Sequence, residues 1–137
     1  MKIRLFTDGG SRDNPGESAC AFFIESEEGE IIKGHYLGIM TNNQAEYMGL
    51  IKGLMYILKT MGGNNSIEIF MDSQLIVNQI KGIYKVKNAE LKKLNVRVNA
   101  LLEQFSEYTI EHIKRELNAK ADTELNRILD DNKQGEN

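Results

Sequence analysis

The chain has little cysteine and no long apolar run. Its 137 residues, 15.5 kDa in all, suffice for one domain that buries a core without disulfides or a structural zinc. The single cysteine, Cys20, lies in the apolar run 19–24, which predicts a small buried side chain in a reducing compartment. The lack of a signal-peptide core and of an apolar membrane span predicts a cytoplasmic protein with no membrane partner.

The chain also has no excess of positive charge, with 17 Lys and Arg residues against 20 Asp and Glu residues. The net charge is −3 and the sequence pI is about 5.5, which argues against a protein that simply coats nucleic acid. Basic residues are nevertheless concentrated between positions 81 and 97, where Glu90 is the one acid. Both a solvated helix surface and a patch that follows phosphates fit this pattern. The basic residues are Lys81, Lys85, Lys87, Lys92, Lys93 and Arg97.

Four acids stand in marked local contexts, each beside glycine, amide or hydroxyl residues. Hard divalent cations such as magnesium prefer oxygen ligands, and acids that converge from distant segments form a site for two of them. This pattern is typical of nucleases. Taken one at a time, each acid could also be an ordinary turn, cap or helix-start residue. The acids are Asp8 in TDGG, Glu46 in TNNQAE, Asp72 in MDSQ and Asp122 in NAKAD.

Hydrophobic spacing predicts an α/β domain with crossover helices. Strands are expected at 3–7, at 18–26 and 30–39 as a hairpin, at 66–71 and at 108–114. Apolar residues at helical spacing predict a helix from Tyr47 to the Gly62-Gly63 stop, and Asp72-Ser73 caps a short helix through Ile80. A helical stripe follows over 91–105, and a last helix spans 118–131 with Asn118 as its cap, before a frayed tail, 132–137.

In such sheets, sites form at the carboxyl ends of the strands. Asp8 and Asp72 fall at predicted strand ends, whereas Glu46 and Asp122 fall at the starts of predicted helices, so all four can reach one place. Phosphodiester hydrolysis needs a nucleophilic water and a stabilised leaving oxygen, and two cations supply both. We assign Asp8 as the bridging ligand because a central strand can be approached from both sides. Glu46 and Asp72 then hold one ion and Asp122 the other.

The segments FTDGGSRDNPG, TNNQAEYMGL, MDSQLIVNQIKG and RELNAKAD together resemble type 1 ribonuclease H over nearly the whole chain. The resemblance implies a ribonuclease H-like fold, a five-stranded mixed sheet flanked by helices, as a single domain over 1–131. It implies two Mg²⁺ ions, replaceable by Mn²⁺, held by the four acids. The implied activity is endonucleolytic cutting of the RNA strand of RNA–DNA hybrids, leaving 5′-phosphate and 3′-hydroxyl ends, by a protein with no obligate partner that we expect to be monomeric.

Uncharged polar residues beside the acids suit a hybrid, whose wide minor groove presents 2′-hydroxyls and base edges. The resemblance implies that Asn14, Asn43 and Gln74 touch the RNA strand, and that Thr41 and Asn42 bind a DNA-strand phosphate. Turn and cap chemistry would explain Asn14 and Asn42 equally well. The remaining expected substrate-binding residues are Ser73, Arg115 and Asn118.

The chain departs from the best-known family pattern in two segments. The loop before Asp122 lacks the insertion that carries a mobile histidine, and Arg115 or Lys114 is expected to meet the departing phosphate instead. The segment after Gly82 is too short for the full basic protrusion, and there is no tryptophan, as in a compact archaeal and bacterial subgroup. Two alternatives stay open: a nuclease of the same superfamily acting on double-stranded RNA, and a non-catalytic hybrid-binding domain.

Overall fold

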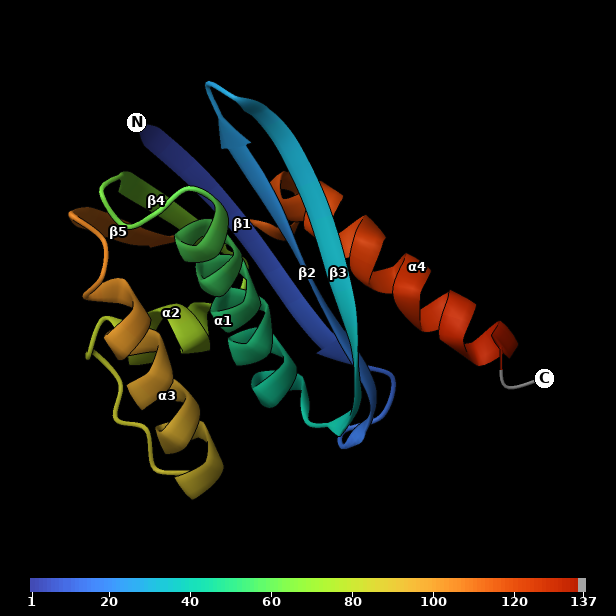
Figure 1. Ribbon diagram of the computed structural model, residues 1–137. Coiled ribbons are helices and arrows are strands. Elements are labelled where there is room, and N and C mark those ends of the chain that lie inside the picture. The colour runs from blue at the N-terminus through green and yellow to red at the C-terminus, as the bar shows by residue number, and fades with distance from the viewer. Residues whose placement is uncertain (136–137) are drawn as a thin grey trace.

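Five strands and four α-helices make up the protein in the computed structural model, which describes residues 1–135 (Figure 1). A short 3-10 helix, Arg115–Asn118, precedes the last α-helix. In chain order the elements are β1 Lys2–Ser11, β2 Gly16–Ser26, β3 Gly29–Met40, α1 Asn42–Thr60, β4 Ser66–Met71, α2 Gln74–Ile80, α3 Ala89–Leu102, β5 Glu107–His112 and α4 Ala119–Gly135.

The strands form one mixed sheet in the order β3-β2-β1-β4-β5. β1, β2 and β3 are antiparallel neighbours, whereas β4 lies parallel to β1, and β5 parallel to β4. The predicted hairpin is confirmed, with a register shift between Ser18 and Ala19. β1 is the central strand, and the predicted five-stranded mixed sheet with flanking helices is confirmed.

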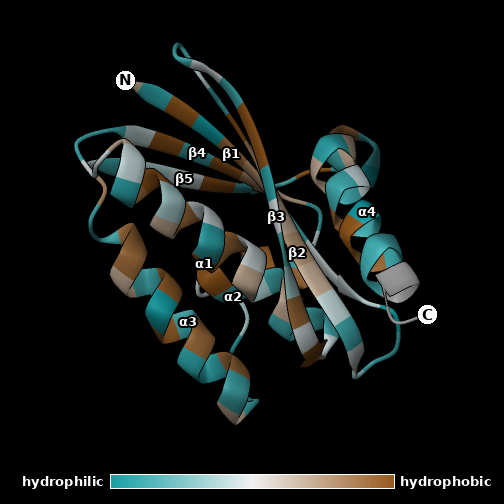
Figure 2. Ribbon diagram, turned by 45° about the vertical axis from the view of Figure 1, so that its right-hand side comes forward, coloured by the Kyte–Doolittle hydropathy of each residue, from teal (hydrophilic) through white to brown (hydrophobic). Residues whose placement is uncertain are grey.

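Helices cover both faces of the sheet, with α1, α2 and α3 on one side and α4 on the other (Figures 1 and 2). β2 serves both layers because successive side chains on a strand point to opposite faces. Phe22 and Ile24 join the larger core with α1, whereas Ala19 and Ala21 pack with Leu125 of α4. The small alanines let α4 lie close to the sheet. Cys20 is fully buried, as the sequence predicts.

Three predicted boundaries are wrong by four residues or more, each for a local reason. β1 continues past Asp8 to Ser11 because its last residues still pair with β2. α1 begins at Asn42 rather than near Tyr47, since its first turn is polar and is fixed by a capping box between Thr41 and Gln44 instead of by apolar packing. α4 continues to Gly135, so the tail predicted from 132 is helical as far as that residue; 136–137 lie outside the described residues.

No helix among the described residues is long and apolar enough to span a bilayer.

Candidate active site

Asp8 and Asp72 are brought together by strand register. The parallel pairing of β1 with β4 ends at Thr7 opposite Met71, so the next residue of each chain segment carries one of the two acids. β4 stops there, whereas β1 runs on and pairs Asp8 with Ala21 of β2. Asp8 is therefore inside the central strand, and its side chain is only 4% exposed. Asp72 is half-buried on the strand-to-helix turn that the sequence predicts.

Glu46 reaches the same place because α1 packs directly on the backbone of β1. A Cβ atom on Gly9 would overlap the backbone of Ala45, and one on Gly49 would lie 2.7 Å from the Asp8 carbonyl oxygen. Both contacts are shorter than a side chain tolerates, so glycine at these two positions permits the close approach. The first turns of α1 thereby place Glu46 next to Asp8 of β1. Glu46 is 8% exposed.

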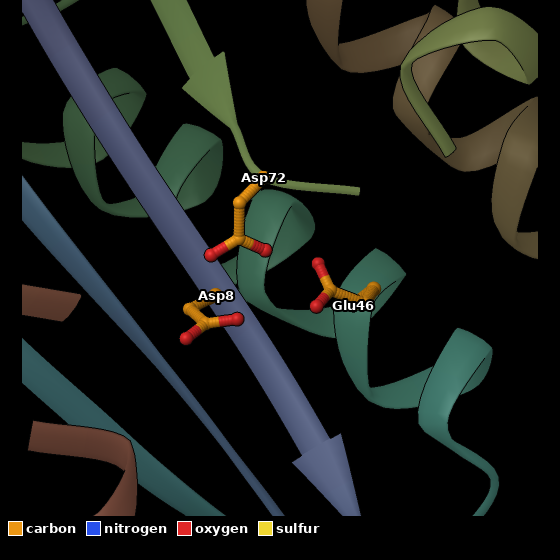
Figure 3. Close-up of side chains that lie close together, drawn as sticks. All are labelled: Asp8, Glu46 and Asp72. Atoms are coloured by element: carbon orange, nitrogen blue, oxygen red, sulfur yellow. The ribbon is translucent and has the colours of Figure 1, made fainter. Parts of the chain in front are cut away.

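The three acids point toward one another (Figure 3). One carboxylate oxygen from each of Asp8, Glu46 and Asp72 lies within 4.8 Å of the other two. Glu46 Oε2 is buried and has no hydrogen-bond partner, although a buried polar atom without a partner is costly. Three converging oxygens, one of them unsatisfied, fit a hard divalent cation such as magnesium.

Crowding changes how these acids titrate. Burial is the largest of the effects that together raise the pKa of Asp8 from 3.8 to about 7. The charge of Asp72 and the hydrogen bond and charge of Asp122 act in the same direction, whereas a hydrogen bond with Glu46 opposes them. Burial also raises the pKa of Glu46 well above its usual value, with added contributions from the charges of Asp8 and Asp72. The folded protein thus holds like charges in a poorly solvated place, and a cation would relieve their repulsion.

Asp122 comes to the site from the opposite face of the sheet. It lies in the first turn of α4 and, with Asp8 and Glu46, lines a hollow of about 500 Å³. The side chain of Asn126, one helical turn further on, donates a hydrogen bond to the Asp122 carbonyl oxygen at 2.9 Å and lies 3.4 Å from its Oδ1. The structure therefore gathers all four predicted acids, with Asp122 beside the cluster of three.

Asn118 does not cap α4, contrary to that prediction, and its side chain is buried. It is 2% exposed, and its amide nitrogen lies 2.8 Å from the Thr7 carbonyl oxygen and 3.2 Å from Asp72 Oδ2. Its Oδ1 has no partner, so it accepts no capping hydrogen bond. The side chain turns inward because it links β1 to the acid that follows β4. Asn118 thus positions Asp72, and its contact with a substrate stays a prediction.

The polar residues before α1 are partly engaged in holding the loops together. Asn14 Oδ1 accepts a hydrogen bond from the Asn42 backbone at 3.0 Å, and Asn42 Oδ1 accepts one from the Ser11 backbone at 2.8 Å. Thr41 Oγ1 caps α1 by accepting from Gln44. Hydrogen bonds of turns and of the helix cap therefore account for the side-chain oxygens of Asn14, Asn42 and Thr41. The amide groups of Asn14 and Asn42 stay on exposed residues beside the acids.

Asn43 links two neighbouring hollows. It lines the acidic hollow together with Asn42, and it also lines a second one, of about 400 Å³, with Asn14 and Thr41. Asn14 and Asn43, which are predicted to touch the RNA strand, therefore lie beside Thr41 and Asn42, which are predicted to bind the DNA strand.

Ser73 and Arg115 also line the acidic hollow. Ser73 Oγ caps α2 by accepting from Ile76 at 3.3 Å, and Arg115 begins the 3-10 helix. Gln74 is exposed at the start of α2 and lines none of the hollows described here. Sequence reasoning missed Arg12 and Asn126 as lining residues; the spacing of four between Asp122 and Asn126 could have revealed the latter.

Comparisons with known proteins agree with this architecture. A family model described as reverse transcriptase-like matches residues 6–127. Ribonuclease HI of Halobacterium salinarum is 36% identical over 132 residues, which cover 95% of this chain and 65% of that protein. A bifunctional protein of Mycobacterium tuberculosis is 37% identical over 95% of this chain but only 36% of its own length. The chain thus spans about a third to two thirds of these curated relatives.

Solved structures give the same picture. The crystal structure of RNase H1 from Halobacterium salinarum matches with a TM-score of 0.90 and 35% identity, covering 96% of this chain and 99% of that one. LC11-RNase H1, crystallised in complex with an RNA/DNA hybrid, matches with a TM-score of 0.85 and 36% identity over 91% of this chain and 94% of that one. The chain therefore belongs to the reverse transcriptase-like family and is a ribonuclease H-like domain with the RNase H1 fold.

Proposed function

We propose that the protein is a metal-dependent endoribonuclease that hydrolyses the RNA strand of RNA–DNA hybrids. The observation that carries the proposal is the meeting of Asp8, Glu46 and Asp72, with an oxygen of each within 4.8 Å of the others. The family membership supports it, as does the hybrid bound by LC11-RNase H1. The related proteins bear the names ribonuclease HI and ribonuclease H, which agrees with a nuclease rather than a passive binding domain.

Two Mg²⁺ ions, with Mn²⁺ as a substitute, fit the donor set because all the candidate ligands are carboxylates. Asp8 is the proposed shared ligand, since it lies between Glu46 and Asp72 on one side and Asp122 on the other. Asp122 lines the hollow with Asp8 and raises its pKa, which supports their proximity. When bound, such a pair of cations would activate a water and stabilise the leaving oxygen.

The residues themselves prepare this site before any substrate arrives. The sheet register fixes Asp8 beside Asp72, and Asn118 holds one oxygen of Asp72 in place. Packing of α1 on glycine backbone fixes Glu46. Because these supports are buried backbone or amide contacts, the ligands need little reorganisation when a phosphate enters, which is the condition for efficient electrostatic catalysis.

Substrate contacts are proposed for the polar rim of the acidic hollow. Arg115 is the candidate to meet the departing phosphate, since a guanidinium suits phosphate geometry and it lines the hollow. Asn43 and Gln74, with the amide of Asn14, are proposed to contact the RNA strand. Thr41 and Asn42 are proposed to bind the DNA strand through atoms that the loop hydrogen bonds leave free. Ser73, at the edge of the hollow, is a further candidate.

A cleavage assay tests the proposal. A hybrid labelled on the RNA strand should be cut internally with Mg²⁺ and left intact with EDTA, whereas single-stranded RNA and DNA duplex should stay whole. Asp72→Asn should abolish cutting, and Asp13→Asn, a matched change on an exposed acid, should not. Equal cleavage by Asp72→Asn and the parent protein would refute the catalytic assignment.

Two alternatives are separated by the same assay. Cutting of double-stranded RNA at a rate similar to that of the hybrid would favour a broader nuclease, and hybrid binding without cutting would favour a non-catalytic domain. Extension of the product by a DNA polymerase would support a 3′-hydroxyl end. The cytoplasmic location, the monomeric state and the limits of the domain at 1–131 stay predictions.

A further inference from the structure

A third hollow lies away from the acids, between β3, α1 and the end of α3. It has a volume of about 620 Å³ and shares no lining residue with the acidic hollow. Its floor is apolar, with Met55 the most exposed part at 46%. Lys52 to Lys59 lie six to thirteen residues beyond Glu46 along α1, roughly 9–20 Å further down the helix axis. The apolar floor comprises Phe22, Met55, Tyr56, Leu58 and Leu101.

Three lysines surround this floor. Lys33 comes from β3, and Lys52 and Lys59 from α1. No ion pair involves any of them within the part of the chain that the structure describes, and no carboxylate lines the hollow. Lys33 Nζ instead lies 5.3 Å from the centre of the Tyr56 ring. In a chain of net charge −3, an uncompensated group of cations around an apolar hollow is an unusual arrangement.

The charges of the lysines affect the protonation of the neighbouring His35. Burial lowers the pKa of His35, and the charges of Lys52 and Lys33 lower it further. The imidazole therefore stays neutral at neutral pH and adds no charge of its own. The cations that an anionic ligand would meet are the three lysines.

The adjoining strand adds a third property. β3 is at the edge of the sheet and, among residues 1–135, pairs with β2 alone, so its other side presents backbone groups without a strand partner there. Such an edge can accept an extended peptide as an additional strand. Together, an apolar floor, unpaired cations and a free sheet edge suit a peptide with acidic and apolar side chains. A nucleic acid would use the lysines but not the aliphatic floor formed by Leu58, Leu101 and Met55.

We propose that the hollow lined by Lys33, Lys52, Lys59 and Met55 is a docking site for an acidic peptide segment of a partner protein, with an apolar side chain inserted into the floor. The site is separate from the catalytic one, so a docked partner would leave the acids accessible. Its existence does not depend on the nuclease activity. Docking here would bring the proposed enzyme to the place where the partner acts.

Fluorescence anisotropy with a short labelled peptide of alternating Asp and Leu residues tests the site. Lys52→Glu and Lys59→Glu should each weaken binding by about three- to tenfold, the scale of one or two exposed charge pairs. Met55→Asp should weaken binding by removing the apolar contact. The matched control Lys87→Glu, on the exposed segment before α3, should leave the affinity unchanged. Raising the salt concentration should weaken binding of the parent protein.

Several results would overturn the proposal. Equal binding of an Asp/Ser peptide would show that only charge is read, and absence of Asp/Leu binding would remove the site. Displacement of the peptide by a single-stranded DNA oligonucleotide that also needs Lys52 and Lys59 would assign the lysines to nucleic acid. Circular dichroism melts should match the parent for each variant, and hybrid cleavage should match the parent for the variants at Lys52, Lys59 and Met55. Lys33→Glu replaces any variant that fails to fold.

Discussion

Removal of one buried charge should stabilise the metal-free protein. In Asp8→Asn the amide keeps the shape of the carboxyl group but cannot ionise. Because the pKa of Asp8 rises from 3.8 to about 7 on folding, the native state binds the proton more tightly than the unfolded chain does. The cost of ionising Asp8 in the folded protein therefore grows as the pH rises above 3.8, and it is fully present above about pH 7.

The size of the effect follows from the same values. Each pKa unit corresponds to about 1.36 kcal/mol, so the rise in the pKa of Asp8 from 3.8 to about 7 corresponds to a destabilisation on the order of 4 kcal/mol. We expect Asp8→Asn to be more stable than the parent by about 2–4 kcal/mol at pH 8. The lower end of this range allows for rearrangement of the neighbouring acids, which relieves part of the repulsion in the parent. In a domain of this size each kcal/mol raises the Tm by about 3–5 °C, so a rise of about 6–20 °C is expected.

Thermal melts in EDTA at pH 4, 6 and 8 measure this directly. The parent and variant should melt alike at pH 4 and diverge as the pH rises. Millimolar Mg²⁺ should raise the Tm of the parent by ligand binding and have a smaller effect on the variant. Asp13→Asn, which changes an exposed acid, should behave as the parent does. A parent that is more stable than Asp8→Asn at pH 8, or a difference that does not change with pH, would refute the reasoning.

Three further predictions concern the supports of the site and its metal. Asn118→Ser removes the amide that lies 3.2 Å from Asp72 Oδ2, so Mg²⁺ affinity measured by calorimetry should fall about 10- to 100-fold; unchanged affinity would contradict a positioning role. Gly49→Ala pushes a methyl group against the Asp8 backbone and should cost about 1–3 kcal/mol in denaturant melts. Gly53→Ala, which meets only a flexible leucine side chain, should cost little or be stabilising. Mg²⁺ must displace the Asp8 proton, so Mg²⁺ affinity should increase about tenfold for each unit by which the pH is raised toward about 7, and should level off at higher pH. A flat profile between pH 5 and 7 would exclude this competition.

The sheet was predictable because its signals are local. The alternation in β4 and the turn residues between β2 and β3 specify those strands in the sequence, and the structure reproduces both. Boundaries set by polar contacts were not predictable from apolar spacing. The first turn of α1 contains amides held by the cap at Thr41, and β1 continues because β2 pairs with it.

The gathering of the acids was predictable, but the supports that hold them were not. Asp8 and Asp72 directly follow Thr7 and Met71, the last paired residues of two parallel strands, and strand topology implies that such positions meet. The inward turn of Asn118 depends on a distance of 3.2 Å to Asp72 across the fold, and no sequence pattern reports such a contact. Turn chemistry and ligand binding also use the same residue types, so Asn42 could not be assigned from its context alone.

Anomalous diffraction from crystals soaked in Mn²⁺ tests the central claim most directly. We expect manganese peaks about 2 Å from carboxylate oxygens, one shared by Asp8, Glu46 and Asp72 and a second between Asp8 and Asp122. A soaked crystal in which manganese binds elsewhere, with none of these oxygens as a ligand, would contradict the account.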